Sequence, residues 1–232
     1  MDNVLCAVDG THIHIWCPED GAGDYINRKG FRSVVFQGAA IGTTLEFVDW
    51  AGGWAGSVGD SLVFKNSELF RQFVMGAWGD SVLLGDAAYG LHTWMMTPYE
   101  RGLHLPESES RFNFWQSSGR MTVERAFGVL KKRFPILCSP FSFNVAWVCK
   151  VVTFCVTIHN ICCVVEDEWD DNDMDMWVES LESPPGCEEY NFDNDEFVQA
   201  LTRARPSNEA KAKRDHLAST LPPLPQFRRD GF

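Results

Sequence analysis

The sequence has no C-x-x-C pair and no N-terminal signal for secretion. Its eight cysteines therefore follow neither a zinc-finger pattern nor a secreted disulfide framework, and we interpret them as reduced and mostly buried. No internal repeat is apparent, so one domain with additions is the simplest organisation. The only apolar run long enough to suggest a membrane span, residues 145–165, is interrupted by Lys150, His159 and Asn160. We expect a core helix there, no membrane contact, and a soluble intracellular protein.

Positive charge is scarce, and the formal net charge of −12 argues against a generic nucleic-acid binder. The deficit is uneven. Residues 1–162 carry 13 Lys/Arg and 15 Asp/Glu, a net charge of −2, whereas residues 163–232 carry 7 and 17, a net charge of −10. We interpret residues 163–232, the acidic part, as a solvated linker. The alternative is that this acidic part occupies an active-site groove in place of DNA or binds a basic partner.

Apolar residues are plentiful: they make up 45% of the chain and include 9 Trp and 17 Phe, enough to bury a sizeable core. β-Branched and aromatic runs predict strands, the second and third of which form a hairpin, at residues 3–9 (continuing as extended chain over 11–16), 32–41, 44–50, 81–85 and 94–98. Helical patterns are found at residues 61–75, which residues 57–60 could cap, and at 120–134, 144–165 and 207–221. Residues 101–110 resemble a polar loop and residues 166–196 a flexible segment.

Acidic side chains follow two of the predicted strands. Asp9 ends the first strand, before an Asp-Gly turn signal, and Asp86 comes just after the fourth. The helix over residues 120–134 presents Glu124 between Arg120 and Lys131 at the edge of an apolar stripe. Three carboxylates brought together repel one another unless a cation neutralises them, and Mg²⁺ and Mn²⁺ prefer such oxygen ligands. If these acids converge, they could hold metal ions that assist attack on a phosphodiester. Arg120 and Lys131 could then contact the phosphates.

Several short motifs occur in an order that resembles the nuclease domain of PIF/Harbinger transposases and their domesticated derivatives, over residues 1–165. They are AVDGTHI (7–13), YINRKGF (25–31), AGSVGDS (55–61), LLGDAAYG (83–90), TPY (97–99), FN (112–113), RMTVERAFGVLKKRF (120–134) and IHNIC (158–162). The resemblance implies an α/β fold of the RNase H-like (retroviral-integrase-like) kind, a mixed sheet flanked by helices. It also implies a DDE metal site of Asp9, Asp86 and Glu124 that binds Mg²⁺ or Mn²⁺, with Asp60 as a further candidate ligand.

The chain departs from the family pattern at three positions and in its extent. Relatives usually have Pro at Ala55, His at Gly59 and His at Gln116, which affects loop rigidity and one polar contact near the site. Full-length relatives carry an N-terminal helical region, whereas this chain begins just before the first catalytic strand, as a fragment or truncated product would. In the family a separate Myb/SANT-like protein supplies sequence-specific DNA binding and nuclear import, so we expect DNA and such a protein as partners. The expected location is the nucleus, with the cytoplasm as a second possibility.

Other patterns favour simpler interpretations. A dehalogenase-type phosphatase is disfavoured, because Ala7 stands at the position of the aspartyl nucleophile and Gly90 where a second acid would follow Asp86. His12 and His14 suit structural or solvent-facing roles better than a metal site. We expect His159, Cys162 and Cys163 to pack in the core rather than bind zinc. We expect Lys131 to contact phosphate, and Lys132 and Arg133 to be exposed to solvent.

These observations predict three parts: a DDE nuclease domain (1–165), an acidic flexible segment (166–206), and a short C-terminal helix with a Pro-rich end (207–232). The predicted activity is metal-dependent DNA hydrolysis or strand transfer. The alternative is a catalytically silent, domesticated protein that keeps the fold as a protein-interaction or DNA-binding module.

Overall fold

A computed structural model of the chain describes residues 3–16, 23–100, 102, 104–165 and 206–224. The acidic segment predicted at 166–206 lies, apart from its last residue, outside the described residues. The Pro-rich end beyond residue 224 also lies outside them.

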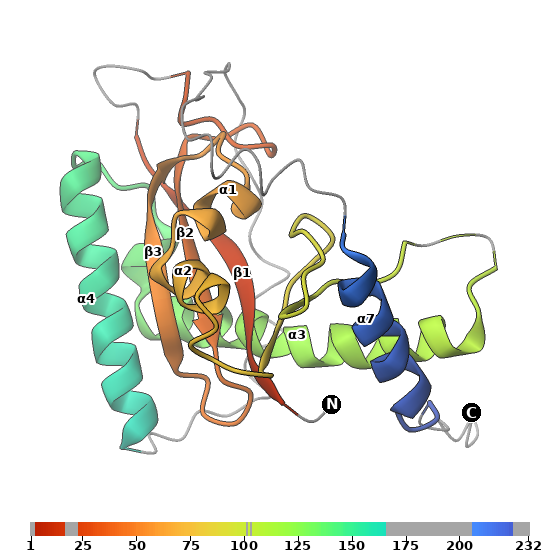
Figure 1. The fold of residues 1–232 in the computed structure, drawn as a ribbon. Coiled ribbons are helices and arrows are strands. Elements are labelled where there is room, and N and C mark those ends of the chain that lie inside the picture. Colours follow the sequence, from red (N-terminus) through yellow and green to blue (C-terminus); the bar gives the residue numbers. More distant parts are fainter. Residues whose placement is uncertain (1–2, 17–22, 101, 103, 166–205, 225–232) are drawn as a thin grey trace, which may run out of the picture.

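Five strands form one mixed sheet in the order β3-β2-β1-β4-β5 (Figure 1). The first three pair antiparallel, as the predicted hairpin required, and β4 and β5 join β1 in parallel. The chain is therefore an α/β protein with a mixed sheet. The strands are β1 (Val4–His14), β2 (Ser33–Ala40), β3 (Phe47–Ala55), β4 (Val82–Leu84) and β5 (Met95–Met96).

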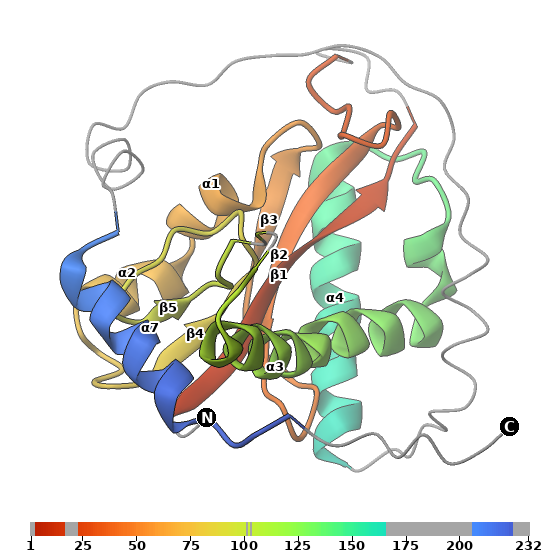
Figure 2. The same cartoon turned by 90° about the vertical axis from the view of Figure 1, so that its right-hand side faces the viewer.

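Helices cover both faces of the sheet, because side chains alternate along each strand and both faces are apolar (Figures 1 and 2). In β1, Cys6 and Val8 pack towards α1 (Asp60–Lys65) and α2 (Glu68–Val74), whereas Ala7 and Ile13 pack towards the helices of the other layer. That second layer consists of α3 (Glu107–Arg133), the 3₁₀ turn η1 (Pro135–Cys138), α4 (Val145–Val164) and α7 (Asn208–Thr220).

The C-terminal helix α7 packs onto α3. Ala210 and Ala218 are buried in the core shared with α3. The Tyr99 hydroxyl donates to Asp215 over 2.6 Å, and the Arg214 guanidinium lies 3.8 Å from the centre of the Tyr99 ring. The described part of the C-terminal region is thus joined to the main body by apolar, polar and cation–π contacts.

Four sequence predictions about these elements need correction. β1 does not end at Asp9, because Asp9 and Gly10 pair with β2 and the strand continues to His14. The predicted helix 61–75 is two helices, and Gly59 at the N-cap of α1 makes no side-chain capping bond. Residues from Glu107 onward, predicted as loop, already belong to α3. Finally, α4 is not packed inside the domain all round, since one face is open to solvent.

Among the described helices, α4 is the one long and apolar enough to cross a membrane by length and composition. Its other face packs on β3 and α3. Asn160 makes two hydrogen bonds with the backbone of Phe47, and His159, which is fully buried, bonds the carbonyl of Leu45 and the guanidinium of Arg133. The packing role predicted for His159 is confirmed, whereas the solvent exposure predicted for Arg133 is wrong.

Candidate active site

Asp9 and Asp86 lie level with each other because of the register between β1 and β4. The last parallel pair is Ala7 with Leu84, and each aspartate stands two residues beyond its member of that pair. The strands part at this point, since β1 continues along β2 while the chain after β4 turns away. The divergence leaves room for polar side chains at the end of a buried strand pair.

Asp60 reaches the same place from the opposite helical layer. It is the first residue of α1, and its carboxylate rests against Gly10, where an added Cβ would collide with Oδ1 and Cγ of that group. Asp9 precedes Gly10 in the strand, and its Oδ1 accepts the Gly10 N–H over 2.9 Å. Asp9 belongs to β1 itself, and Asp60 packs against the next residue of that strand from the layer of α1.

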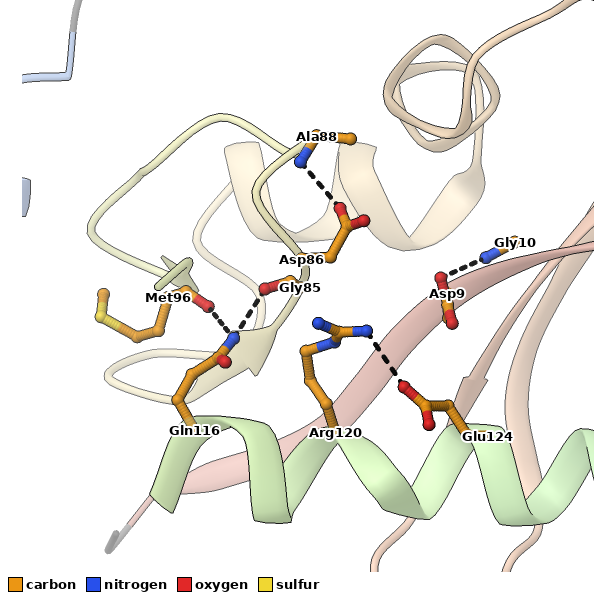
Figure 3. A network of polar contacts seen from close by, with 9 residues as sticks. All are labelled: Asp9, Gly10, Gly85, Asp86, Ala88, Met96, Gln116, Arg120 and Glu124. Atoms are coloured by element: carbon orange, nitrogen blue, oxygen red, sulfur yellow. Dashed lines mark hydrogen bonds and ion pairs between the residues drawn. The ribbon is translucent and has the colours of Figure 1, made fainter. Parts of the chain in front are cut away.

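Helix α3 presents three polar side chains to the strand ends, one turn apart (Figure 3). Gln116 is fully buried and donates through Nε2 to the carbonyls of Gly85 at 2.7 Å and Met96 at 3.2 Å. Arg120 points between the loop of Asp86 and Asp9, and it forms an ion pair with Glu124 over 3.1 Å. In α3, Gln116 thus holds the end of β4, Arg120 supplies a cation one turn later, and Glu124 supplies an acid one turn after that.

The charges at this site act on one another. Burial, which penalises the ionised form, raises the pKa of Asp9 to about 6; the Gly10 N–H and Arg120 oppose that shift, and the charges of Asp60 and Asp86 add to it. The pKa of Asp60 is also raised, first by burial and then by Asp86, while Arg28 opposes the shift. The acids thus share a partly buried place with the cations Arg120 and Arg28, and a bound divalent cation would relieve the repulsion among them.

Tyr89 adds a polar group that has no partner. Its hydroxyl is buried and, among the residues that the structure describes, finds no hydrogen-bond partner. Its pKa lies well above its ordinary value because of burial and then the charges of Asp60, Asp9 and Asp86. An orphaned hydroxyl beside a group of carboxylates is a donor available to an oxygen atom bound at this site.

The carboxylates do not yet form a coordination sphere in this arrangement. Within the described residues, no three His, Cys, Asp or Glu side chains are close enough together to hold a metal ion. Asp86 turns one oxygen to the backbone N–H of Ala88 at 2.8 Å, and Glu124 turns to Arg120. The Glu124 side chain is 54% exposed, so its pair with Arg120 is open to solvent and weak. The donor set, all carboxylate oxygen, fits Mg²⁺ or Mn²⁺.

The remaining predicted residues lie further along α3 and β1. Lys131 stands two turns beyond Glu124 and is half-buried. Burial lowers the pKa of Lys131; Cys138 opposes that shift, and the charge of Lys29 adds to it. His12 makes a 2.9 Å contact through Nδ1 with the Ser33 hydroxyl, so the structural role predicted for it is confirmed. The contact of Lys131 with phosphate stays a prediction.

Comparison with known proteins identifies the family. A family model described as "DDE superfamily endonuclease" matches residues 8–160. The chain belongs to this family. A human protein named "Putative nuclease HARBI1" is 33% identical over 199 residues, covering 82% of this chain and 53% of that protein. The cattle protein of the same name is 32% identical over 199 residues, with the same coverage.

A plant relative is less similar to this chain than the two mammalian proteins are. The "Protein ALP1-like" of Arabidopsis thaliana is 27% identical over 191 residues, covering 72% of this chain and 45% of that protein. The chain therefore spans about half the length of the curated relatives it matches. No solved structure gives a significant match. The Harbinger-type resemblance in the sequence motifs is confirmed by these relatives.

Three residues near these acids have roles that the sequence does not predict. The Asp9-Gly10 pair predicts a turn, Gln116 predicts only an altered polar contact near the site, and Tyr89 is only part of the LLGDAAYG motif. A glycine directly after a candidate ligand, inside a β-branched run, was the available signal that another side chain comes close. Tyr89 and Gln116 give no such signal, because Tyr89 is placed by packing against Phe64 of α1, and Gln116 by where α3 crosses the end of β4.

Proposed function

We propose that this chain is a divalent-metal-dependent DNA endonuclease derived from a Harbinger-type transposase, which hydrolyses or transfers phosphodiester bonds. The observation that carries the proposal is that Asp9, Asp60 and Asp86, from β1, α1 and the end of β4, lie near enough for their charges to add to the raised pKa of Asp9 and Asp60, with Glu124 beside them on α3. The mixed sheet with helices on both faces supports an RNase H-like fold for the domain.

Each residue has a defined part in this proposal. Asp9, Asp86 and Glu124, with Asp60 as a further ligand, would hold Mg²⁺ or Mn²⁺; when bound, such ions lower the pKa of the attacking water or hydroxyl and stabilise the leaving oxygen. Before a metal ion binds, Arg120 offsets the negative charge of the acids; once metal and DNA are bound, it contacts a phosphate oxygen. Gln116 keeps the chain after β4 in place, so that Asp86 stays level with Asp9.

The rest of the family expectation belongs to the same proposal. Lys131 contacts the DNA backbone, a Myb/SANT-like protein supplies sequence recognition, and the protein acts in the nucleus. The net charge of −2 over residues 1–162 supports a division of labour, because such a surface gives little of the sequence-independent attraction on which DNA binding relies.

The test is nicking of supercoiled plasmid in Mn²⁺ by the full chain, with Mn²⁺ binding measured in parallel by calorimetry. We expect nicking that is lost in Asp86→Asn and in EDTA and is kept in Asp80→Asn, which changes an exposed aspartate before β4. A folded protein with neither nicking nor Mn²⁺ binding would refute the enzyme and leave the silent interaction module as the account. Binding without nicking would place the ion here and assign cleavage to the assembly with a partner or N-terminal region.

A further inference from the structure

Residues 27–30, shortly before β2, form a tight turn that carries two cations, and we call it the basic turn. Gly30 donates its N–H to the carbonyl of Asn27 over 2.9 Å, so Arg28 and Lys29 are the two central residues. The φ of Gly30 is 82°, a left-handed conformation that suits glycine at the end of the turn. Arg28 and Lys29 are both exposed, and their charged ends are therefore accessible to a ligand.

Buried Asn27 braces the basic turn from within. Its Oδ1 accepts the N–H groups of Lys29 over 2.9 Å and of Phe31 over 3.3 Å, and its Nδ2 donates to the Ser33 hydroxyl over 3.0 Å. Ser33 is fully buried at the start of β2 and also contacts Nδ1 of His12 in β1. Because the backbone that carries the cations is tied to two strands, little ordering is needed when a ligand binds.

The basic turn adjoins the segment that leads into α1. The Ser57 N–H donates to the carbonyl of Asp24 over 3.1 Å, and a Cβ on Gly59 would stand 3.9 Å from Nη2 of Arg28. Asp60 follows Gly59 directly. Burial and then Asp86 raise the pKa of Asp60, and the charge of Arg28 opposes that shift. Arg28 therefore stands beside the acids of the candidate active site.

Lys29 lies near Lys131 of α3. Burial is the first cause of the lowered pKa of Lys131, and the charge of Lys29 adds to it. Burial also lowers the pKa of His12 to about 4, with contributions from the charges of Lys131, Lys29 and Arg28. Within the part of the chain that the structure describes, no ion pair involves Arg28, Lys29 or Lys131. Three cations are thus gathered beside the acids, where they repel one another.

We propose that Arg28, Lys29 and Lys131 bind successive phosphates of the DNA strand whose reacting phosphodiester lies at the acids. Arg28, which adjoins Asp60, binds the phosphate next to the reacting one through its planar guanidinium, and Lys29 and Lys131 bind the following phosphate as point charges. The inference rests on the proposed function, because that function places a phosphodiester at the acids. It adds the course of the strand beyond them.

A DNA strand accounts for this arrangement better than another anion does. Its charges repeat along its length, so they match cations that lie side by side from the acids outward. A single free anion would leave part of the positive charge unpaired. An acidic protein segment also repeats its charge, but only a DNA strand continues directly from a phosphodiester held at the acids. Since residues 1–162 have a net charge of −2, a braced group of three cations gives the attraction where it is needed.

The test is binding of a labelled DNA duplex, measured by fluorescence anisotropy between about 50 and 200 mM salt. Each variant is made in the whole 232-residue chain that also carries Asp86→Asn, which keeps the probe uncut. Arg28→Gln and Lys29→Gln should each reduce the slope of log Kd against log salt by about 0.9, the value for one phosphate contact. At about 0.1 M salt, Kd should rise roughly eightfold, which is the effect of that slope between 0.1 M and 1 M salt.

Two controls separate the charge of the basic turn from charge elsewhere and from folding. Lys211→Gln removes an exposed cation from α7, whose Lys213 bonds the carbonyl of Asp80 before β4, at the far end of the sheet from the basic turn. It should leave the slope unchanged. Lys29→Arg keeps the charge and should keep the slope. Circular dichroism checks that each variant is folded.

A full slope in both Arg28→Gln and Lys29→Gln, or no binding of the duplex by the parent chain at low salt, would overturn the inference. Tighter binding by these variants would also overturn it, and would assign the basic turn to an acidic protein segment that competes with DNA. Plasmid nicking keeps the two proposals apart. A wild type that nicks, with the full slope in both variants, retains the proposed function and loses this inference. A wild type that neither nicks nor binds Mn²⁺, with the slope reduced in both variants, supports the phosphate contacts and refutes the enzyme.

Discussion

Gly10 of β1 cannot carry a side chain without displacing Asp60, because an added Cβ would collide with the Asp60 carboxylate. The same residue donates its N–H to Asp9. One glycine therefore serves two acids, by making room for the first and by favouring the charged form of the second. Its presence inside a strand, where glycine is unfavourable, is explained by this double contact.

We predict that Gly10→Ala displaces Asp60 and lowers Mn²⁺-dependent nicking by roughly 10²-fold, the loss expected when a group at a reacting centre is misplaced by about 1 Å. The control is Gly42→Ala, since a Cβ at Gly42 would meet only the Thr122 hydroxyl, at 3.8 Å. The measurement is the initial nicking rate of each variant at equal folded concentration. An unchanged rate for Gly10→Ala would show that Asp60 takes no part.

Gln116 is the second residue whose replacement should be informative. Gln116→Leu removes both hydrogen bonds to the carbonyls of Gly85 and Met96 and leaves these buried acceptors with one bond fewer. We expect a loss of about 1–3 kcal/mol, which for a chain of this size lowers Tm by roughly 2–4 °C per kcal/mol. Thermal unfolding measures it, with Ser117→Leu as the control on the exposed side of the same helix. Equal Tm values for the two variants would contradict a bracing role.

At the scale of elements, the sequence predicts the sheet better than the helix boundaries. The hairpin, the short strand before Asp86 and the fifth strand are all present; β2, β4 and β5 are buried on both faces, whereas β3 is mostly half-buried. The break between α1 and α2 was missed, although Ser67 caps α2 by accepting the Phe70 N–H over 3.1 Å. A Ser followed by Glu at the start of a helix is a local signal that the apolar pattern across the break concealed.

The other errors depend on contacts that are distant in sequence. The Asp-Gly pair in β1 has the form of a turn, but the pairing of Gly10 with Gln37 keeps it extended. Residues 144–165, apolar nearly all round, predict a helix packed inside the domain, whereas only the side of α4 that faces β3 and α3 is covered. The convergence of Asp9 with Asp86 followed from the strand order, and the entry of Asp60 from the other layer could not be derived from spacing alone.

Helix α7 gives a prediction at this scale. Arg214 stacks on the Tyr99 ring and donates to the carbonyls of Thr97 and Pro98, which follow β5. Arg214→Ala should therefore loosen the attachment of the helix and lower the free energy of unfolding by about 1–2 kcal/mol. Lys211→Ala, an exposed change on the same helix, should have no measurable effect in the same thermal unfolding experiment. If the two variants unfold alike, the contacts of Arg214 contribute nothing to the attachment of α7.

At the scale of the whole molecule, the site joins both helical layers to the middle of the sheet. Asp60 comes from the layer of α1, Glu124 from the layer of α3, and Asp9 from the strand between them. The same arrangement that assembles the acids also forces like charges together in a partly buried place. The acids that the proposed chemistry requires therefore destabilise the folded chain when no cation is bound.

This opposition can be measured through Asp60→Asn. Because burial and Asp86 raise the pKa of Asp60, its ionised form destabilises the fold near pH 7. A neutral amide of the same shape should increase the free energy of unfolding in EDTA by about 1 kcal/mol or less, because solvent screens the charge of this half-buried group. Mn²⁺ should reverse the order: the wild type gains about 2.7 kcal/mol at a hundredfold excess over Kd, and the variant gains less.

Glu68→Gln is the control of opposite sign, since it removes an exposed pair with Arg71 and should lower stability by about 0–1 kcal/mol in either buffer. Chemical denaturation in EDTA and in Mn²⁺ gives all six values. A lower stability of Asp60→Asn in EDTA would mean that Arg28 compensates the Asp60 charge fully, and the acids would then need no cation to coexist.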